Sequence, residues 1–415
     1  MKINEKYSKY LAKNTWPDIN TQPIQKGEGI YFWDIDNNKF TDFSSQTLNL
    51  LLGQCHPSIV EAIQSQASTL TYASSRFSSL PYLKTAEALV SISPKGFNKV
   101  NIKMCDGSDA NEAAIKTAKK YTGKSGIISF NKGHTGQTTQ TIQLRGYMRD
   151  PEIFIGNVED VVFSDWPKCE TSEDYIESLD DIKLKVKEHG NIAAILVDPM
   201  MVNAGVLVNE GTGGFLKGIQ EICKENDCLF ILDENQSFGW VPQLFATNYY
   251  GISPDIITMG KGLSAGHPLA GILIKEKYDG YLKYNDADFT HGGHALTCAA
   301  ALACINELKN TDFHIEEKEK VIKQRLKALQ EKTEIDITYR GIGLIHGITF
   351  ENNDFETSEN RAKIVYSYLM DKGIFTRLFE NKIILKPSII VTEAQINEVF
   401  DVLQEAFTEL EVKSV

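Results

Sequence analysis

The middle of the chain reads Asp255-Ile256-Ile257-Thr258-Met259-Gly260-Lys261-Gly262. Its apolar, β-branched first half is typical of a short buried strand, and the two glycines around Lys261 predict a bend that presents a single amine. Two earlier runs, residues 193–198 and 229–233, are also apolar, and each ends in an aspartate. In open parallel sheets, ligands bind beyond the carboxyl ends of the strands. The sequence therefore predicts a site in which an amine faces a carboxylate.

An amine that faces a carboxylate suits a cofactor held as an imine. Pyridoxal phosphate is the common case, because a lysine carries it and an aspartate keeps its pyridine nitrogen protonated. Residues 110–121 have helical spacing of small and apolar residues, with Asp109 as the expected N-cap and Gly123 as the expected stop. Gly107 and Ser108 would then lie at the mouth of a helix, where free backbone N–H groups and the helix dipole favour a phosphate.

The rest of the chain predicts an α/β fold. Short apolar strands alternate with amphipathic helices between residues 100 and 274, which indicates a mostly parallel sheet covered on both faces. A charged helix is expected at residues 314–330. Further strands are expected at residues 343–350 and 383–385, and further helices at residues 360–372 and 393–410. The C-terminal part is therefore predicted to be α+β.

These motifs together resemble those of the class III (ornithine/4-aminobutyrate-type) aminotransferases, which are fold type I pyridoxal phosphate enzymes. The resemblance runs nearly end to end and is carried by residues 29–36, 53–57, 107–112, 130–138, 233–236, 254–262 and 290–293. It implies a mostly parallel seven-stranded sheet in a large cofactor-binding domain at residues 51–305. A smaller α+β domain would combine residues 1–50 with residues 306–415.

The resemblance also gives roles to residues around the ring of the cofactor, pyridoxal 5'-phosphate. Lys261 would carry the cofactor and act as general base, and Asp233 would contact the pyridine nitrogen. Gln236 would lie beside the ring hydroxyl. His134 would stack on the ring at a position where the family usually has an aromatic residue. Without the resemblance, His134 would be read as a loop histidine.

The phosphate would be held by Gly107 and Ser108, together with Thr290 from the other subunit of a homodimer with shared active sites. A glycine pair at residues 292–293 permits close backbone approach beside Thr290. His291 and His294 flank this pair, but they lack a cysteine or aspartate at ligand spacing. The sequence therefore predicts no metal.

The chain departs from the family pattern where a substrate carboxylate would bind. Members commonly carry an arginine in the C-terminal strand, ahead of a Pro-Pro-Leu turn, and a glutamate after a core strand. Here Ile384 stands at or next to the arginine position, Asp198 stands where the glutamate is expected, and Trp240 replaces a further arginine. A less cationic pocket favours a substrate without a carboxylate beside the reacting carbon, such as a terminal amine, a diamine or an ω-amino acid.

The second substrate would be a 2-oxo acid, an aldehyde or an ordinary amino acid. A carboxylate on it would need a different cation, for which Arg377, Lys386 and Arg76 are candidates. If the alignment shifts by one or two residues, Lys386 or Arg377 simply takes the role of the arginine.

Composition excludes several classes of protein. The formal net charge of −12 argues against a nucleic-acid surface and against binding to an anionic membrane. The seven cysteines form no CxxC pair, and the first seven residues have no apolar signal core. No apolar stretch approaches the ~20 residues that span a bilayer. We therefore expect a cytoplasmic enzyme that acts on small-molecule amines and carbonyl compounds.

Four functions are open at this point, and aminotransferase is favoured. The same family fold also hosts epimerases, aminomutases and lyases that share the lysine and aspartate. A cofactor-binding scaffold without catalysis would not need both Lys261 and Asp233. A nicotinamide dehydrogenase is disfavoured because no Gly-x-Gly-x-x-Gly opens a helix near the N-terminus.

Overall fold

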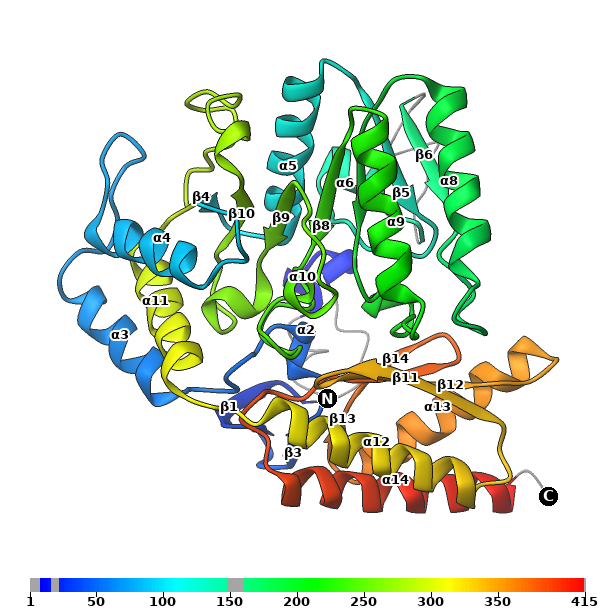
Figure 1. Cartoon of the computed structure of the whole chain (residues 1–415). Coiled ribbons are helices and arrows are strands. Elements are labelled where there is room, and N and C mark those ends of the chain that lie inside the picture. The colour runs from blue at the N-terminus through cyan, green and yellow to red at the C-terminus, as the bar shows by residue number, and fades with distance from the viewer. Residues whose placement is uncertain (1–7, 16–21, 148–159, 414–415) are drawn as a thin grey trace.

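The computed structural model describes residues 8–15, 22–147 and 160–413. Its centre is a seven-stranded sheet, drawn in the upper half of Figure 1. In spatial order the strands are β4 (Lys99–Met104), β10 (Ala270–Ile274), β9 (Ile256–Met259), β8 (Leu229–Asp233), β7 (Ile192–Val197), β5 (Gly126–Phe130) and β6 (Val161–Ser164). Neighbours from β9 to β6 pair in parallel, whereas β10 runs antiparallel to both β9 and β4. The expected mostly parallel seven-stranded sheet is confirmed.

Helices cover both faces of this sheet, because alternate side chains of its buried strands point in opposite directions. One face packs against α8 and α9, with α4 and α11 over β9 and β10, and the other face packs against the alanine-rich side of α5. These helices are α4 (Leu80–Ile92), α5 (Gly107–Thr122), α8 (Tyr175–His189), α9 (Thr212–Glu225) and α11 (Ala295–Asn310).

Two four-stranded sheets lie below the large sheet in Figure 1. One has the order β1 (Ile24–Glu28), β2 (Tyr31–Asp34), β3 (Lys39–Asp42) and β13 (Ile374–Phe375). The other, the C-terminal sheet, has the order β11 (Ile337–Ile342), β12 (Ile345–Phe350), β15 (Lys382–Leu385) and β14 (Arg377–Phe379), and all its pairs are antiparallel. Because β13 pairs with β3, both ends of the chain share a sheet. This supports a small domain built from both termini, whose boundaries stay a prediction.

Helices α12 (Ile315–Lys332), α13 (Phe355–Asp371) and α14 (Glu393–Lys413) bury their apolar sides against these small sheets. They match the three C-terminal helices expected from the sequence, with ends shifted by a few residues. The shorter helices are α2 (Ser45–Leu48), α3 (Pro57–Ala67), α6 (Thr139–Gln143) and α10 (Ala246–Tyr249), and the 3-10 turns are Ser8–Tyr10, Lys13–Thr15, Val202–Ala204, Lys261–Ser264 and Glu276–Tyr278. Within residues 8–15, 22–147 and 160–413, no helix combines the length and apolarity needed to cross a bilayer.

Helix α5 begins one turn earlier than the sequence analysis expected. Its N-cap is Asp106, whose carboxylate accepts the backbone N–H of Ser108 at 2.9 Å. The expected N-cap, Asp109, instead occupies the third helical position, where its carboxylate accepts the backbone N–H of Cys105 at 3.0 Å. The prediction was wrong because both members of this capping box are acidic. Gly123 ends the helix with a φ of 71°, as expected.

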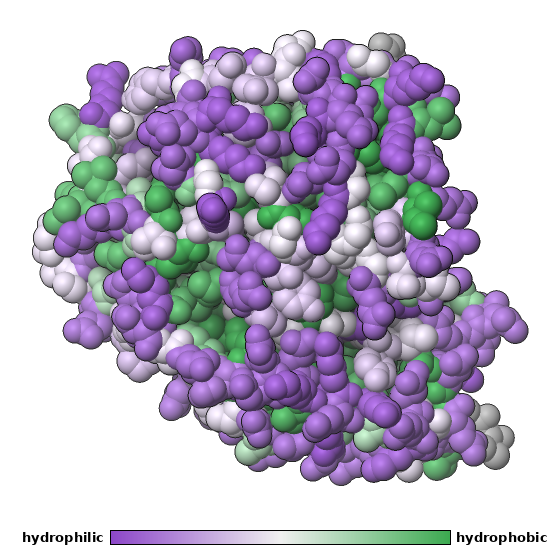
Figure 2. Space-filling view, in the orientation of Figure 1, coloured by the Kyte–Doolittle hydropathy of each residue, from purple (hydrophilic) through white to green (hydrophobic). Residues whose placement is uncertain are grey.

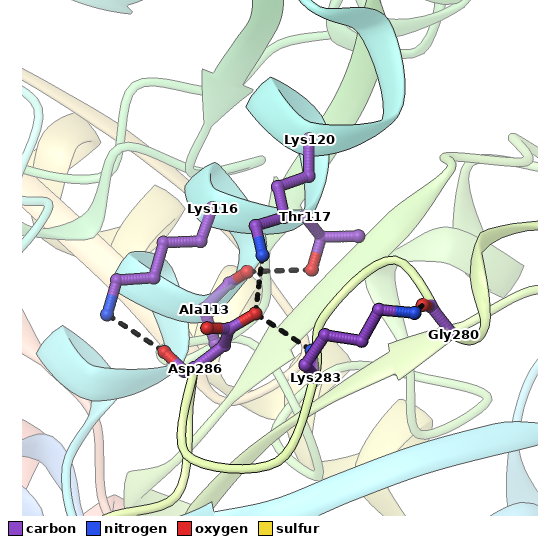
Figure 3. Close-up of polar contacts among 7 residues, drawn as sticks. All are labelled: Ala113, Lys116, Thr117, Lys120, Gly280, Lys283 and Asp286. Atoms are coloured by element: carbon purple, nitrogen blue, oxygen red, sulfur yellow. Dashed lines mark hydrogen bonds and ion pairs between the residues drawn. The ribbon is translucent and has the colours of Figure 1, made fainter.

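The other half of α5 is fixed by the loop that follows the Glu276–Tyr278 turn. Lys120 Nζ lies 2.6 Å from Asp286 Oδ2, and Lys116 Nζ donates to the Asp286 carbonyl at 3.1 Å (Figure 3). The same carboxylate accepts the backbone N–H of Lys283 at 2.8 Å. Together with its buried alanine face, these contacts fix where the N-terminus of α5 points.

Candidate active site

The Lys261 turn directly follows β9 and lies beside the end of β8, because these strands pair in parallel. Lys261 has a backbone φ of 40°, in the left-handed region that is strained for a residue with a Cβ. Both flanking glycines are required by close packing. A Cβ on Gly260 would lie 2.6 Å from Asn235 Oδ1, and one on Gly262 would lie 2.7 Å from the Trp240 ring. The packing therefore fixes the turn that presents the amine.

Asp233, the last residue of β8, has a carboxylate that accepts three hydrogen bonds. Asn111 Nδ2 donates to its Oδ2 at 2.8 Å, and Asn235 donates to its Oδ1 from the backbone N at 3.0 Å and from Nδ2 at 2.6 Å. Asn111 is itself fixed, because it also donates to the Thr135 carbonyl at 2.8 Å and accepts the Thr258 hydroxyl at 2.7 Å. This buried network holds the carboxylate in one orientation.

The sequence analysis gave no role to Asn111 and Asn235. Both lie within quoted motifs, one near the start of α5 and one two residues after Asp233. The available signal was that each is an amide within three residues of a predicted site residue. Their hydrogen-bond partners depend on the packing of α5 beside β8, which the sequence alone does not show.

Lys261 is half-buried in a site of mixed charge. Burial lowers its pKa, and the negative charges of Asp233, Asp106 and Asp198 oppose that shift. Desolvation is the larger effect, so the amine gives up its proton more readily than a lysine in water. This is the property that a general base needs.

Asp198 follows β7 and caps the turn that comes after it. Its carboxylate accepts the backbone N–H groups of Met200, Met201 and Val202 at 2.9, 3.1 and 3.2 Å. Burial and the nearby charge of Asp233 raise the pKa of Asp198 to about 6. The three strand-end residues predicted from the sequence therefore lie together, since β7, β8 and β9 are adjacent.

His134 lies near the lysine, with its Nδ1 2.7 Å from the Tyr147 hydroxyl. Burial lowers the pKa of His134 to about 4, and the positive charges of Lys261, Arg145 and Arg377 act in the same direction. The imidazole is therefore neutral at pH 7. A neutral ring can stack on another aromatic ring without bringing in a further charge.

The mouth of α5 is occupied by a carboxylate of the chain itself. Ser108 Oγ donates to Asp106 Oδ1 at 3.0 Å and accepts the backbone N–H of Gln137 at 3.1 Å. A Cβ on Gly107 would lie 2.6 Å from Asn235 Oδ1, so this position requires glycine. Gly107 and Ser108 are placed where the sequence predicted an anion site, with the exposed Asp106 side chain across it.

Of the residues expected to contact substrate, Ile384 and Arg377 lie on the C-terminal sheet and Trp240 packs beneath the Lys261 turn. Trp240 is fully buried, donates its Nε1–H to the Pro387 carbonyl at 2.9 Å, and supports the Lys261 turn from below. Ile384 is fully buried on β15. Arg377 is half-buried on β14, the neighbouring strand. Substrate contacts by Trp240, Ile384, Asp198 and Arg377 stay predictions.

Comparison with known proteins identifies the family. The model of the class III aminotransferases matches residues 14–407. The chain belongs to this family. It is 31% identical to the acetylornithine aminotransferase of Caldanaerobacter subterraneus subsp. tengcongensis, over 97% of this chain and 99% of that protein. It is 27% identical to the 5-aminovalerate aminotransferase of Pseudomonas aeruginosa, over 94% of this chain and 95% of that one.

Solved structures agree with this assignment. The taurine:2-oxoglutarate aminotransferase from Bifidobacterium kashiwanohense, in complex with PLP and glutamate, superposes with a TM-score of 0.89 at 26% identity and covers 99% of this chain and 98% of its own. A transaminase from the marine bacterium Virgibacillus shares the fold, with a TM-score of 0.90 at 23% identity over 99% of both chains. The protein is a pyridoxal phosphate-dependent aminotransferase of fold type I.

The residues of this aminotransferase fit the cofactor. Two buried amide oxygens, Gln236 Oε1 and Asn235 Oδ1, have no hydrogen-bond partner among the described residues. Buried polar atoms of this kind are rare unless a ligand or water satisfies them. Gln236 would lie beside the ring hydroxyl, Asp233 would contact the ring nitrogen, and Ser108 with the α5 mouth would hold the phosphate. The described residues contain no cluster of three or more potential metal ligands.

Each residue then has a defined task in the reaction. When bound, pyridoxal phosphate withdraws electrons from the substrate carbon and makes its proton acidic. Lys261, whose pKa is lowered by burial, is placed to accept that proton at Nζ and to return it to a neighbouring atom. Asp233 is held by Asn111 and Asn235, so it need not reorganise as charge develops.

Thr290 lies apart from this network, in an exposed segment ahead of α11. Its carbonyl accepts the Tyr72 hydroxyl at 2.9 Å. A Cβ on Gly292 would lie 2.0 Å from the Lys103 carbonyl oxygen, so the glycine pair beside Thr290 does permit close backbone approach. Its role in the phosphate site of a partner subunit stays a prediction.

Proposed function

We propose that this aminotransferase takes its amino group from a terminal amine, a diamine or an ω-amino acid and passes it to a 2-oxo acid or aldehyde. The observation that carries the proposal is the character of β15, the strand where the family resemblance expects an arginine. Ile384 is apolar and fully buried there. A carboxylate beside the reacting carbon would therefore find no cation on this strand at that position.

Similar proteins support the same substrate class. The relatives at 31% and 27% identity are named for acetylornithine and 5-aminovalerate, both of which carry an amine at the end of a chain. The relatives are named aminotransferases, which favours amino transfer over epimerisation, amino migration or elimination. Conversion of the bound cofactor to its amine form by donor alone, in one turnover, is the expected outcome.

The substrate proposal is tested by comparing kcat/KM for a terminal amine and for its α-carboxylated analogue. The terminal amine should react at least as well, because the added carboxylate would lie against Ile384. A preference for the carboxylated compound of tenfold or more, about 1.4 kcal/mol, would contradict the proposal.

We also infer a cytoplasmic homodimer in which Thr290 completes the partner's phosphate site. Apolar residues are exposed around the start of α4 next to Thr290, including Phe77, which is 72% exposed, and Leu80, which is 63% exposed. Figure 2 shows hydrophobic surface at the left edge of the view, where Figure 1 draws α3 and α4. Exposed apolar surface of this kind is typical of a subunit interface. Seven unpaired cysteines suit a reducing compartment.

Sedimentation at assay concentration tests the assembly. The wild-type enzyme should sediment as a dimer, and Phe77→Asp should shift it toward monomer with a matching loss of activity. A fully active monomer would exclude a shared site.

A further inference from the structure

One guanidinium beside the site has no anion to bind. Arg377 is half-buried on β14, and within the part of the chain that the structure describes it makes no ion pair and no side-chain hydrogen bond. Holding a charge partly out of water without a partner is costly, so such groups are usually paired. An unpaired arginine in this position indicates that the guanidinium binds an anionic ligand.

The register of the C-terminal sheet decides which face carries this charge. Arg377 stands directly opposite Ile384, so the two side chains lie on the same face. Phe379, two residues further along β14, shares that face. The centre of its ring lies 5.6 Å from the centre of the Tyr147 ring. The Tyr147 hydroxyl in turn contacts His134 at 2.7 Å. The face that carries Arg377 is therefore turned toward the site.

A second contact places the same face over the end of β7. Gly347 on β12 is the other cross-strand partner of Ile384. A Cβ on Gly347 would lie 2.1 Å from the carbonyl oxygen of Gly205, which belongs to the turn that Asp198 begins. The C-terminal sheet thus packs directly against the turn that follows β7, the strand whose end carries Asp198. Arg377 also lies near enough to influence the titration of both Lys261 and His134.

Lys386, the first rival for the role of carboxylate anchor, is already engaged. Its Nζ donates to the Leu48 carbonyl at 2.9 Å and lies 3.6 Å from the centre of the Trp240 ring. Burial also holds the pKa of Lys386 well below the usual lysine value. This amine is enclosed in the core under the site and offers little charge to a substrate.

Two arginines are also poorly suited. Arg145 is buried and donates from Nε to the Tyr147 carbonyl at 3.0 Å and from Nη1 to Gln137 Oε1 at 3.3 Å. Arg76 is exposed in the segment before α4. Of Lys386, Arg145, Arg76 and Arg377, only Arg377 faces the site and has no hydrogen-bond or ion-pair partner among the described residues.

We propose that Arg377 binds the far carboxylate of a dicarboxylic 2-oxo acid acceptor, the one not joined to its carbonyl carbon, from the strand next to the one that carries Ile384. A guanidinium keeps its charge across the working pH range and can grip a carboxylate through two parallel hydrogen bonds. The inference deepens the proposed function, on which it rests. There the amine donor lacks a carboxylate beside its nitrogen, and here the far carboxylate of the acceptor binds the guanidinium of Arg377.

The test measures the two half-reactions separately in Arg377→Gln and wild type. The donor is n-hexylamine, which has no carboxylate, and the acceptor is 2-oxoglutarate. The ratio of acceptor kcat/KM to donor kcat/KM should fall by about tenfold or more, as expected for loss of a charge-assisted bidentate contact. A smaller change in the ratio, including an equal loss in both half-reactions, would overturn the proposal.

A binding measurement separates this idea from the proposed function. Calorimetric titration with glutarate, an unreactive dicarboxylate, should show about tenfold weaker affinity in Arg377→Gln and an intermediate value in Arg377→Lys. Unchanged glutarate affinity would overturn the assignment of Arg377 whatever amine the enzyme uses. If wild type does not react with n-hexylamine but glutarate affinity still depends on Arg377, the proposal for the amine donor is wrong and the carboxylate-binding role of Arg377 is retained.

The matched control is Arg361→Gln. Arg361 lies on α13, which packs against the face of the C-terminal sheet that carries Ile383 and Leu385, opposite to the face of Ile384 and Arg377. Its replacement removes the same charge from the protein but not from the site, so both the half-reaction ratio and the glutarate affinity should equal those of wild type. A loss as large as that of Arg377→Gln would show that overall charge, and not this contact, governs acceptor binding.

Discussion

At the strand ends of the large sheet, Asp233 accepts three hydrogen bonds from two buried asparagines, whereas on the C-terminal sheet Arg377 has no partner among the described residues. On the cofactor wall, defined by Lys261, Asp233 and Asn111, the Asp233 carboxylate and the Asn111 amide have hydrogen-bond partners within the chain. The substrate wall, defined by Arg377 and Ile384, leaves a charge for a ligand. Internal satisfaction suits a permanent cofactor that must be held in one geometry, and an open charge suits substrates that come and go.

The largest effect should come from Lys261→Ala. Turnover should fall by at least about 10³-fold, because one change removes both the general base and the group that carries the cofactor. Steady-state assays measure the loss, and the exposed Lys283→Ala serves as a control for removing a lysine. Glutarate affinity should persist in Lys261→Ala, since that contact belongs to the substrate wall. Substantial turnover by this variant would refute the site assignment.

The next largest effect is a pH dependence of the folding stability, which Asp198 causes at the cofactor wall. Its folded-state pKa is about 6 against an ordinary value of 3.8, so the folded protein holds this proton more tightly than the unfolded chain. The resulting stability is fully present below about pH 4 and is lost as the pH rises through 6, by at most about 3 kcal/mol. Urea unfolding from pH 4 to 7 should therefore show a steeper fall in wild type than in Asp198→Asn. Parallel curves for the two proteins would contradict this.

The two walls differ in how well the sequence predicts them. Lys261, Asp233 and Asp198 each follow a continuous apolar run, and a buried parallel strand requires no long-range information to be recognised. Strand β14 has only three residues, Arg377 to Phe379, which is too short for any periodicity. Its pairing of Arg377 with Ile384 is a tertiary contact, so the sequence could name Arg377 only as one of several cations.

Some errors lie within the cofactor wall itself. The N-terminus of α5 was misplaced because Asp106 and Asp109 are both good capping residues, and only the backbone shows which one lies outside the helix. The roles of Asn111 and Asn235 depend on α5 and β8 being neighbours, which local pattern does not reveal. Outside the cofactor wall, strand β11 of the C-terminal sheet was missed, since its alternating residues include a glycine and an arginine near the turn into β12.

Asn111→Ala, on the cofactor wall, should lower the free energy of unfolding more than Arg377→Gln, on the substrate wall. It leaves an oxygen of Asp233 and the Thr258 hydroxyl without their present partner in a buried site, which costs about 1–3 kcal/mol. Urea unfolding of the cofactor-free protein measures the loss. Arg377→Gln should change the free energy of unfolding by less than about 0.5 kcal/mol, because that side chain has no partner to lose. Equal destabilisation by both variants would remove the distinction between the two walls.

The smallest effect concerns Asp106, where the cofactor wall is least well matched to its ligand. Its carboxylate accepts hydrogen bonds from the backbone N–H and the hydroxyl of Ser108, which are donors that a phosphate at the α5 mouth would use. A phosphate must therefore displace an exposed carboxylate of like charge. Asp106→Ser removes the charge and keeps a capping oxygen, so affinity for pyridoxal phosphate should rise about two- to fivefold, the scale of a single charge at a helix N-terminus. Fluorescence titration of the cofactor-free protein measures this affinity, with pyridoxal, which lacks the phosphate, as the matched ligand. If Asp106→Ser strengthens both ligands equally, the change acts on the ring site; if it weakens pyridoxal phosphate, Asp106 helps to hold the loop that binds the phosphate.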